Sequence, residues 1–158
     1  MDDIPLGAFI SITYRSHFVW INNRMKELGL SAGQFFVLMV LSRHQGVTQD
    51  ALAWQLLIDK GSIARAVTVL ESKGFVKRIT DESNRRAVRI HLTDKGERLI
   101  PEIFTIDREM EEASLSGLKE EEKTQARALL RKIAQNSYEA AYKNGDRKWK
   151  EFPLKDLQ

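Results

Sequence analysis

The spacing of apolar residues in the first third of the chain predicts two helices. Between residues 4 and 28, apolar positions recur at intervals of three and four, and Gly29 is placed to end the segment. These positions are Phe9, Ile12, Val19, Ile21, Met25 and Leu28. A second helix is expected after Ser31, a candidate N-cap, and it should end near Gly46. Its strongly apolar face carries Phe35, Leu38, Met39 and Leu41.

Two short helices are expected to follow in close succession. Thr48 can cap the first and Asp59 the second, and only Leu57 and Ile58 link them. Their inner faces carry Leu52, Ala53, Leu56, Ile63, Ala66, Val67 and Leu70, and Gly74 ends the second helix. The outer face of the second helix carries Lys60, Ser62, Arg65 and Thr68. Two short helices joined by so tight a turn indicate a helix-turn-helix.

The periodicity then changes from helical to strand-like. Residues 75–79 and 87–92 are predicted strands, and in the second one Val88, Ile90 and Leu92 alternate with polar residues. The connection between them is rich in turn formers and ends in two adjacent arginines, Arg85 and Arg86. A helix-turn-helix followed directly by a hairpin is a winged helix.

A winged helix gives the two arginines a role in binding double-stranded DNA. The major groove is about 12 Å wide and admits a helix, whereas an arginine on the wing is favoured in the narrow, electronegative minor groove. We therefore expect base and phosphate contacts from Lys60, Ser62, Arg65 and Thr68, backbone contacts from Thr48 and Gln49, and minor-groove contacts from Arg85 and Arg86.

Two further helices are predicted after Thr93. Leu99, Ile103, Ile106 and Met110 form one apolar stripe, in which Pro101 is expected to lie near a bend. Acidic residues 120–122 suit the positive end of the last helix, whose stripe is Ala126, Leu129, Leu130, Ile133, Ser137 and Ala141. These helices either fold back on the first helix of the same chain or pair with a second copy.

Charge supports a nucleic-acid partner only in the middle of the chain. The net charge is +3, and residues 44–93 hold eight basic and five acidic residues, so this segment accounts for the whole excess. No apolar run approaches the roughly 18 residues of a membrane span, and the first residues, MDDIPLG, are acidic rather than basic. A cytoplasmic protein is therefore expected.

The composition offers little for catalysis. The chain has no cysteine, its three histidines (His17, His44 and His91) are far apart, and it lacks a glycine-rich phosphate loop, G-x-S-x-G or H-E-x-x-H. We predict no enzyme activity, no metal and no cofactor. The alternative to a DNA-binding protein is a winged helix that binds a protein partner through the same basic surface; an enzyme would need a site assembled from distant residues.

The segment from Thr48 through Thr93 resembles the winged-helix core of the MarR family of transcription regulators. The resemblance is strongest in DKGSIARAVTVLESKGFVKRITDESNRRAVRIHLTDKG and includes the LT-x-x-G ending at Leu92, Thr93 and Gly96. It places Arg86 at the wing arginine of the family and Asp59 at an acid that can orient it. It differs at Asn84, where the family usually has Asp and this chain therefore lacks an ion pair.

The resemblance implies a mainly α fold with a small β-hairpin wing, in which a winged helix-turn-helix core (31–93) lies between dimerisation helices (1–30 and 94–158). It implies a homodimeric regulator, a repressor, that binds an inverted repeat and responds to a small aromatic carboxylate or phenolic ligand. The family's ligand cleft would here be lined by Tyr14, Arg15, His17, Phe18, Gln34 and Phe35. The alternative is that Phe18 and Phe35 belong to the core and that Arg15 and His17 make dimer contacts.

Overall fold

A computed structural model describes residues 4–81, 84 and 87–142 of the chain. The chain divides into two compact units, Met1–Glu112 and Ala113–Gln158. The elements in chain order are α1 (Leu6–Glu27), α2 (Ala32–Leu41), β1 (Val47–Thr48), α3 (Gln49–Leu56), α4 (Lys60–Ser72), β2 (Val76–Thr80), β3 (Val88–Leu92), α5 (Asp94–Ser114) and α6 (Glu120–Tyr142). The mainly helical fold with a β-hairpin wing is confirmed.

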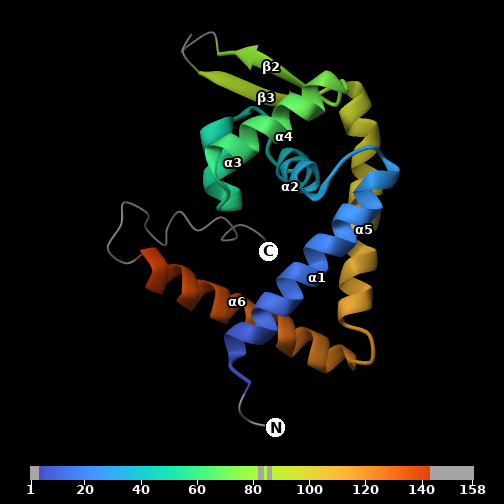
Figure 1. The fold of residues 1–158 in the computed structure, drawn as a ribbon, viewed down its shortest axis with the longest axis vertical. Coiled ribbons are helices and arrows are strands. Elements are labelled where there is room, and N and C mark those ends of the chain that lie inside the picture. The colour runs from blue at the N-terminus through green and yellow to red at the C-terminus, as the bar shows by residue number, and fades with distance from the viewer. Residues whose placement is uncertain (1–3, 82–83, 85–86, 143–158) are drawn as a thin grey trace. The chain divides into compact units, whose positions relative to one another are not determined.

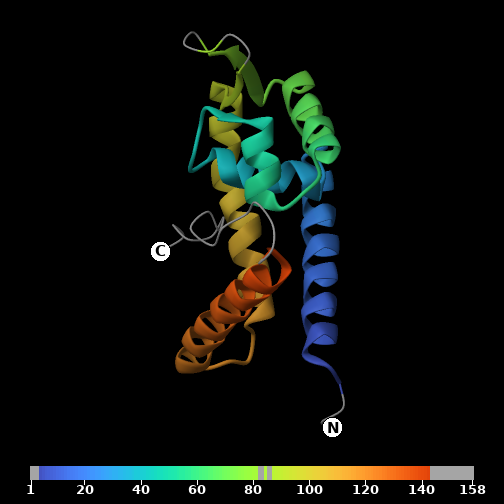
Figure 2. The same ribbon diagram turned by 90° about the vertical axis from the view of Figure 1, so that its left-hand side faces the viewer.

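The core of the first unit is built around α2. This short helix contacts α1, α3, α4 and β3 (Figures 1 and 2). Phe35, Val37, Leu38 and Leu41 of α2 are 2% exposed or less. The buried side of α4 adds Ile63, Ala66, Val67 and Leu70, and the sheet adds Val76, Ile90 and Leu92. The inward positions expected from the periodicity of the two short helices therefore lie in one apolar core.

Side-chain caps fix where the helices of the core begin. The hydroxyl of Thr48 accepts a hydrogen bond from the amide of Ala51 at 3.1 Å, and a carboxylate oxygen of Asp59 accepts one from the amide of Ser62 at 2.8 Å. Because the first amides of a helix have no partner within it, such caps define its start. Both predicted caps are confirmed.

The start of α2 and the turn between α3 and α4 are also held locally. The amide and hydroxyl of Ser31 donate to the side-chain oxygen of Gln34 at 2.8 and 2.6 Å. Leu57 ends α3 in the left-handed region, with φ of 54°, and the amide of Ile58 reaches back to the carbonyl of Ala53 at 3.1 Å. The turn is therefore as short as the sequence predicted.

The sheet has one strand more than the sequence predicted. Its order is β1-β3-β2, and both pairings are antiparallel, with Val47 opposite Ile90 and Arg78 also opposite Ile90 on the other side. The hairpin of β2 and β3 was expected, but β1 was not. A strand of two residues is too short to show any alternation of apolar and polar positions.

The base of the wing is held by an ion pair that the sequence did not suggest. The guanidinium of Arg89 lies 2.6 Å from a carboxylate oxygen of Asp81 and also donates to the carbonyl of Gly46 at 2.9 Å. Arg89 thus ties β3 to the end of β2 and to the loop before β1.

The junction between the sheet and α5 explains the LT-x-x-G ending. Thr93 donates from its hydroxyl to the carbonyl of Gly74 at 2.6 Å and from its amide to the carbonyl of Phe75 at 3.0 Å. Its hydroxyl also accepts from the amide of Gly96 at 3.1 Å. A β-carbon on Gly96 would overlap the carbonyl oxygen of Phe75. Glycine is therefore required where α5 begins.

The long helices are buried along only part of the predicted apolar stripes. In α5, Ile103, Ile106 and Met110 are buried as expected, and Pro101 lies inside the helix. In α1, only Ile21 and Met25 of the stripe are buried. Three other residues of the α1 stripe are exposed, and so are two leucines of α6: Phe9, Ile12, Val19, Leu129 and Leu130 are each 53–61% exposed.

The Gly96→Ala substitution should destabilise the fold, because the added methyl group meets the backbone of Phe75. Overpacking of this kind costs about 1–3 kcal/mol in the free energy of unfolding. Urea unfolding followed by far-UV circular dichroism measures the loss. Gly7→Ala in α1 is the matched control, because nothing lies within 4 Å of its added carbon. Equal stability of the two variants would contradict the packing argument.

Candidate nucleic-acid interface

The exposed side of α4 carries the residues expected to contact DNA. Lys60, Arg65 and Thr68 are exposed and Ser62 is half-buried, while the opposite side of the helix is packed into the core. Ser62, Arg65 and Thr68 follow one another along one side of the helix, because residues three apart are neighbours on a helix surface. Lys60 lies two residues before Ser62 and projects from another side of the first turn. Three of the four predicted residues therefore share one side of α4, and Lys60 lies at its first turn.

The first turn of α4 holds one of these side chains in place. Arg65 donates to the hydroxyl of Ser62 at 2.8 Å, while the amide of Ser62 donates to Asp59. Hydrogen bonds from the side chain and backbone of Ser62, with a smaller contribution from the positive charge of Arg65, lower the pKa of Asp59. The ionised form of the capping carboxylate is thus favoured, and Ser62 links Asp59 to Arg65.

The start of α3 lies next to the start of α4. Asp50, in the first turn of α3, pairs with Lys60 at 2.9 Å. Thr48 and Gln49 immediately precede it, and both are half-buried. The hydroxyl oxygen of Thr48 already accepts the capping hydrogen bond of α3, so its other lone pair and its proton are what it can offer a partner.

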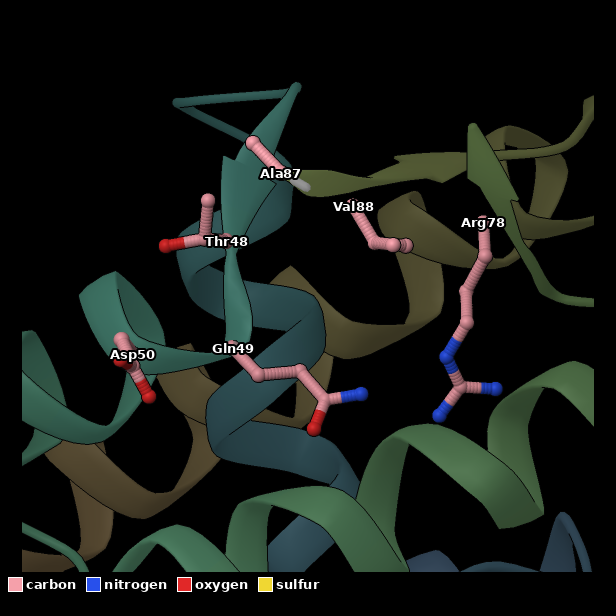
Figure 3. A pocket seen from close by; sticks show the side chains of 6 residues that line it. All are labelled: Thr48, Gln49, Asp50, Arg78, Ala87 and Val88. Carbon is pink, nitrogen blue, oxygen red and sulfur yellow. The ribbon is translucent and has the colours of Figure 1, made fainter. Parts of the chain in front are cut away.

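Arg78 of β2 reaches from the sheet to α4. Its guanidinium forms an ion pair with Glu71 and donates to the hydroxyl of Thr68 at 3.4 Å. Figure 3 shows the guanidinium and the amide of Gln49 extending into the same open pocket of about 490 Å³. The pocket is lined by Thr48, Gln49, Asp50, Arg78, Ala87 and Val88. The first turn of α3 and the base of the wing thus border one hollow beside α4.

The two wing arginines, Arg85 and Arg86, lie outside the described residues. Their neighbours Ala87 and Val88 line the pocket, and the pair between Asp81 and Arg89 holds the strands that lead to the tip. The minor-groove role of the two arginines therefore stays a prediction from the sequence.

The six residues expected to line a ligand cleft fall into two groups. Gln34 and Phe35 are 8% and 2% exposed; Gln34 accepts hydrogen bonds from Ser31, and the ring of Phe35 packs edge-on against Phe36 at 5.4 Å. Tyr14, Arg15 and Phe18 are exposed on α1, and the rings of Tyr14 and Phe18 lie 6.4 Å apart. The first group serves the core, and only the second is accessible.

His17, the sixth residue of this set, is half-buried near charged groups of other helices. Burial, and next the negative charge of Glu111, raise the pKa of Asp107 on α5, while the charges of Arg43 and His17 lower it in part. His17 therefore lies close enough to a half-buried carboxyl to interact with it.

Three charged residues of this surface were missed by the sequence analysis: Asp50, Glu71 and Arg78. Arg78 is seven positions beyond Glu71, across a change from helix to strand. No regular periodicity connects two such positions, so only the fold brings them together. For the pair of Asp50 and Lys60, the sequence offered one signal of a contact, which was the opposite charge of two residues at the starts of successive helices.

Two features of the described residues bear on other functions. No helix in this part of the chain is both long and apolar enough to cross a membrane. Within the same residues, no group of three or more His, Asp or Glu side chains could hold a metal ion.

Comparison with known proteins identifies relatives over most of the chain. The model of the MarR family matches residues 30–88. The uncharacterized HTH-type transcriptional regulator YybA of Bacillus subtilis (strain 168) is 32% identical over 115 residues, which cover 73% of this chain and 77% of the relative.

Solved structures agree with this result. A MarR transcriptional regulator from Methanosarcina mazei Go1 is 34% identical with a TM-score of 0.81, covering 85% of this chain and 97% of that one. A MarR family transcriptional regulator from Listeria monocytogenes, complexed with 26mer DNA, is 28% identical with a TM-score of 0.78, covering 94% and 99%. The chain belongs to the MarR family of transcriptional regulators.

Proposed function

We propose that this regulator is a homodimeric, sequence-specific, double-stranded-DNA-binding repressor that acts in the cytoplasm on an inverted repeat. The observation that carries the proposal is the outer side of α4, whose polar side chains are exposed while its inner side is fixed in the core. The Listeria monocytogenes relative complexed with DNA supports the choice of DNA as partner. The relatives are named as regulators, which favours binding over catalysis.

In this proposal α4 enters the major groove. Lys60, Ser62, Arg65 and Thr68 contact base edges and phosphates, because helix residues on one side can follow the groove floor and its wall. Thr48 and Gln49 contact the phosphate backbone from the start of α3, where the helix dipole and free amides favour an anion. Arg85 and Arg86 of the wing contact the minor groove.

The exposed apolar side chains of the long helices support a dimer. Residues 1–30 and 94–158 form the dimerisation segments, and residues 31–93 the DNA-binding core. Side chains as apolar as Phe9 and Ile12 of α1, and Leu129 and Leu130 of α6, are more than half exposed in the single chain. Large apolar side chains left exposed in such number are typical of an interface. A two-fold dimer would present two copies of α4 to half-sites about 34 Å apart.

A small aromatic carboxylate or phenolic ligand would modulate DNA binding through α1. Tyr14 and Phe18 offer two neighbouring rings, and Arg15 between them offers a cation for a carboxylate. His17 lies on the same helix, while Gln34 and Phe35 support the site from the core. A ligand bound here would alter the contacts of α1 and, through them, the spacing of the two DNA-binding cores.

Sheared genomic DNA incubated with the protein at about 0.15 M salt, near physiological ionic strength, should yield an enriched inverted repeat. Arg65→Ala should weaken binding to that duplex by about 1–3 kcal/mol, the range for loss of a specific base contact. Fluorescence anisotropy measures the affinity, and Arg98→Ala, an exposed arginine of α5, is the control. If no sequence is enriched, the protein-partner alternative takes precedence.

Leu130→Glu should convert the dimer into a monomer, because a carboxylate cannot be buried in an apolar interface without a partner. Sedimentation velocity measures the shift in mass. Ile79→Glu is the matched control, since Ile79 is also exposed, at 43%, but lies on the wing. A dimer that survives Leu130→Glu, or a wild-type monomer, would contradict the assignment of α6.

Salicylate should bind the protein, and Arg15→Ala should weaken that binding about tenfold or more, the scale of one charged hydrogen bond. Isothermal titration calorimetry of the dimer measures the dissociation constant. The Arg98→Ala variant removes the same charge from α5 and should bind as the wild type does. Equal losses in both variants would mean that only net charge matters.

A further inference from the structure

An ion pair joins the first turn of α3 to the first residue of α4, and it is the most exposed ion pair of the surface proposed to contact DNA. We use "recognition surface" for Thr48–Asp50, the cap Asp59, the outer side of α4 through Glu71, and Arg78. Lys60 and Asp50 lie 2.9 Å apart, and their side chains are 74% and 70% exposed. Exposed pairs contribute little to folding stability, because water already solvates both charges well. The contribution of this pair to the stability of the fold is therefore small, and a change to either residue can be tested without unfolding the protein.

The other two cations of the recognition surface also have partners within the protein. Arg78 pairs with Glu71 and hydrogen-bonds to Thr68 at 3.4 Å, with 27% and 38% of the paired side chains exposed. Arg65 bonds to Ser62 at 2.8 Å, within the field of Asp59. Each of the three cations thus has a protein partner before any DNA arrives.

The recognition surface is consequently balanced in charge. It carries three cations (Lys60, Arg65, Arg78) and three carboxylates (Asp50, Asp59, Glu71). Affinity for DNA of any sequence comes mainly from cations that neutralise phosphates and release counterions. A cation already paired with a carboxylate releases fewer, and the carboxylate itself repels the phosphates. The paired cations and the repulsion by the carboxylates weaken hydrogen bonds from Ser62, Thr68 or Arg65 to base edges less than they weaken phosphate contacts.

We propose that Asp50 and Glu71 are specificity-determining residues, which hold Lys60 and Arg78 in intramolecular ion pairs and thereby suppress binding to DNA of arbitrary sequence. The inference rests on the proposed function, since it concerns the same surface. In this proposal the two acids contribute to specificity without contacting a base. The two acids lower the affinity for non-specific DNA more than the affinity for the specific site, and they thereby raise the ratio of the two affinities.

The test compares two duplexes, the sequence enriched from genomic DNA and alternating poly(dI–dC), by fluorescence anisotropy over a series of salt concentrations. Asp50→Asn should bind poly(dI–dC) roughly 3- to 10-fold more tightly, and the slope of log K against log salt should steepen by about 0.9, one phosphate contact. The gain on the enriched duplex should be smaller, so the ratio of affinities falls. Glu71→Gln should act in the same direction through Arg78.

Two control variants test whether the gain in affinity comes from the release of Lys60. Glu139→Gln makes the same charge change on exposed α6 and should alter neither affinity. In a Lys60→Gln background, Asp50→Asn should give a clearly smaller gain, because it removes the repulsion between the carboxylate and the phosphates but frees no cation. A gain of equal size in that background, or with Glu139→Gln, overturns the proposal, as does an unchanged affinity of Asp50→Asn for poly(dI–dC). Thermal unfolding confirms that each variant is folded.

Failure of this inference differs from failure of the proposed function. If the wild-type protein binds neither duplex, DNA binding itself is wrong and the acids have no such role. If the wild type binds and discriminates between the duplexes but Asp50→Asn matches it on both, only the role of the acids is wrong.

Discussion

The packing of α4 against α2 is the constraint on which the rest of the structure depends. Ile63, Val67 and Leu70 are buried on one side of α4 against a core that includes Phe35 and Leu38. Burying each such side chain contributes about 1.5–3 kcal/mol, so rotation of α4 about its axis would be very costly. The polar side of the helix is therefore fixed outward by its apolar side, and local caps decide only where the helix begins.

The same packing also determines which charged residues of the recognition surface pair with each other. Once α4 is fixed, Lys60 comes within reach of Asp50 on α3, and Glu71 comes within reach of Arg78 on β2. Neither pair is local in sequence, and neither is deep enough in the protein to be needed for the core. The proposed DNA-binding surface lies in a segment that is positive in the sequence count. Among the described residues of the recognition surface, the charges are balanced.

The long helices α1 and α6 differ from α4, because several of their apolar side chains are not covered by other residues in the described part of the chain. Ile21 and Met25 of α1 join the core, yet Phe9 and Ile12 of the same helix are more than half exposed. One amphipathic pattern thus serves two purposes along one helix. Periodicity identifies the stripe but does not say what covers it, so the sequence left open whether a second copy is needed.

What the sequence determined by itself was local: helix periods, the caps at Thr48 and Asp59, the tight turn and the hairpin all depend on residues within one or two turns of each other. Family motifs added Gly96, but the reason for that glycine, the carbonyl of Phe75 against it, appears only in the fold. The two-residue strand β1 and the partners of Lys60 and Arg78 were decided by tertiary structure alone. The physical reason is that an ion pair or a short strand depends on a partner brought close by core packing, and sequence spacing carries no record of it.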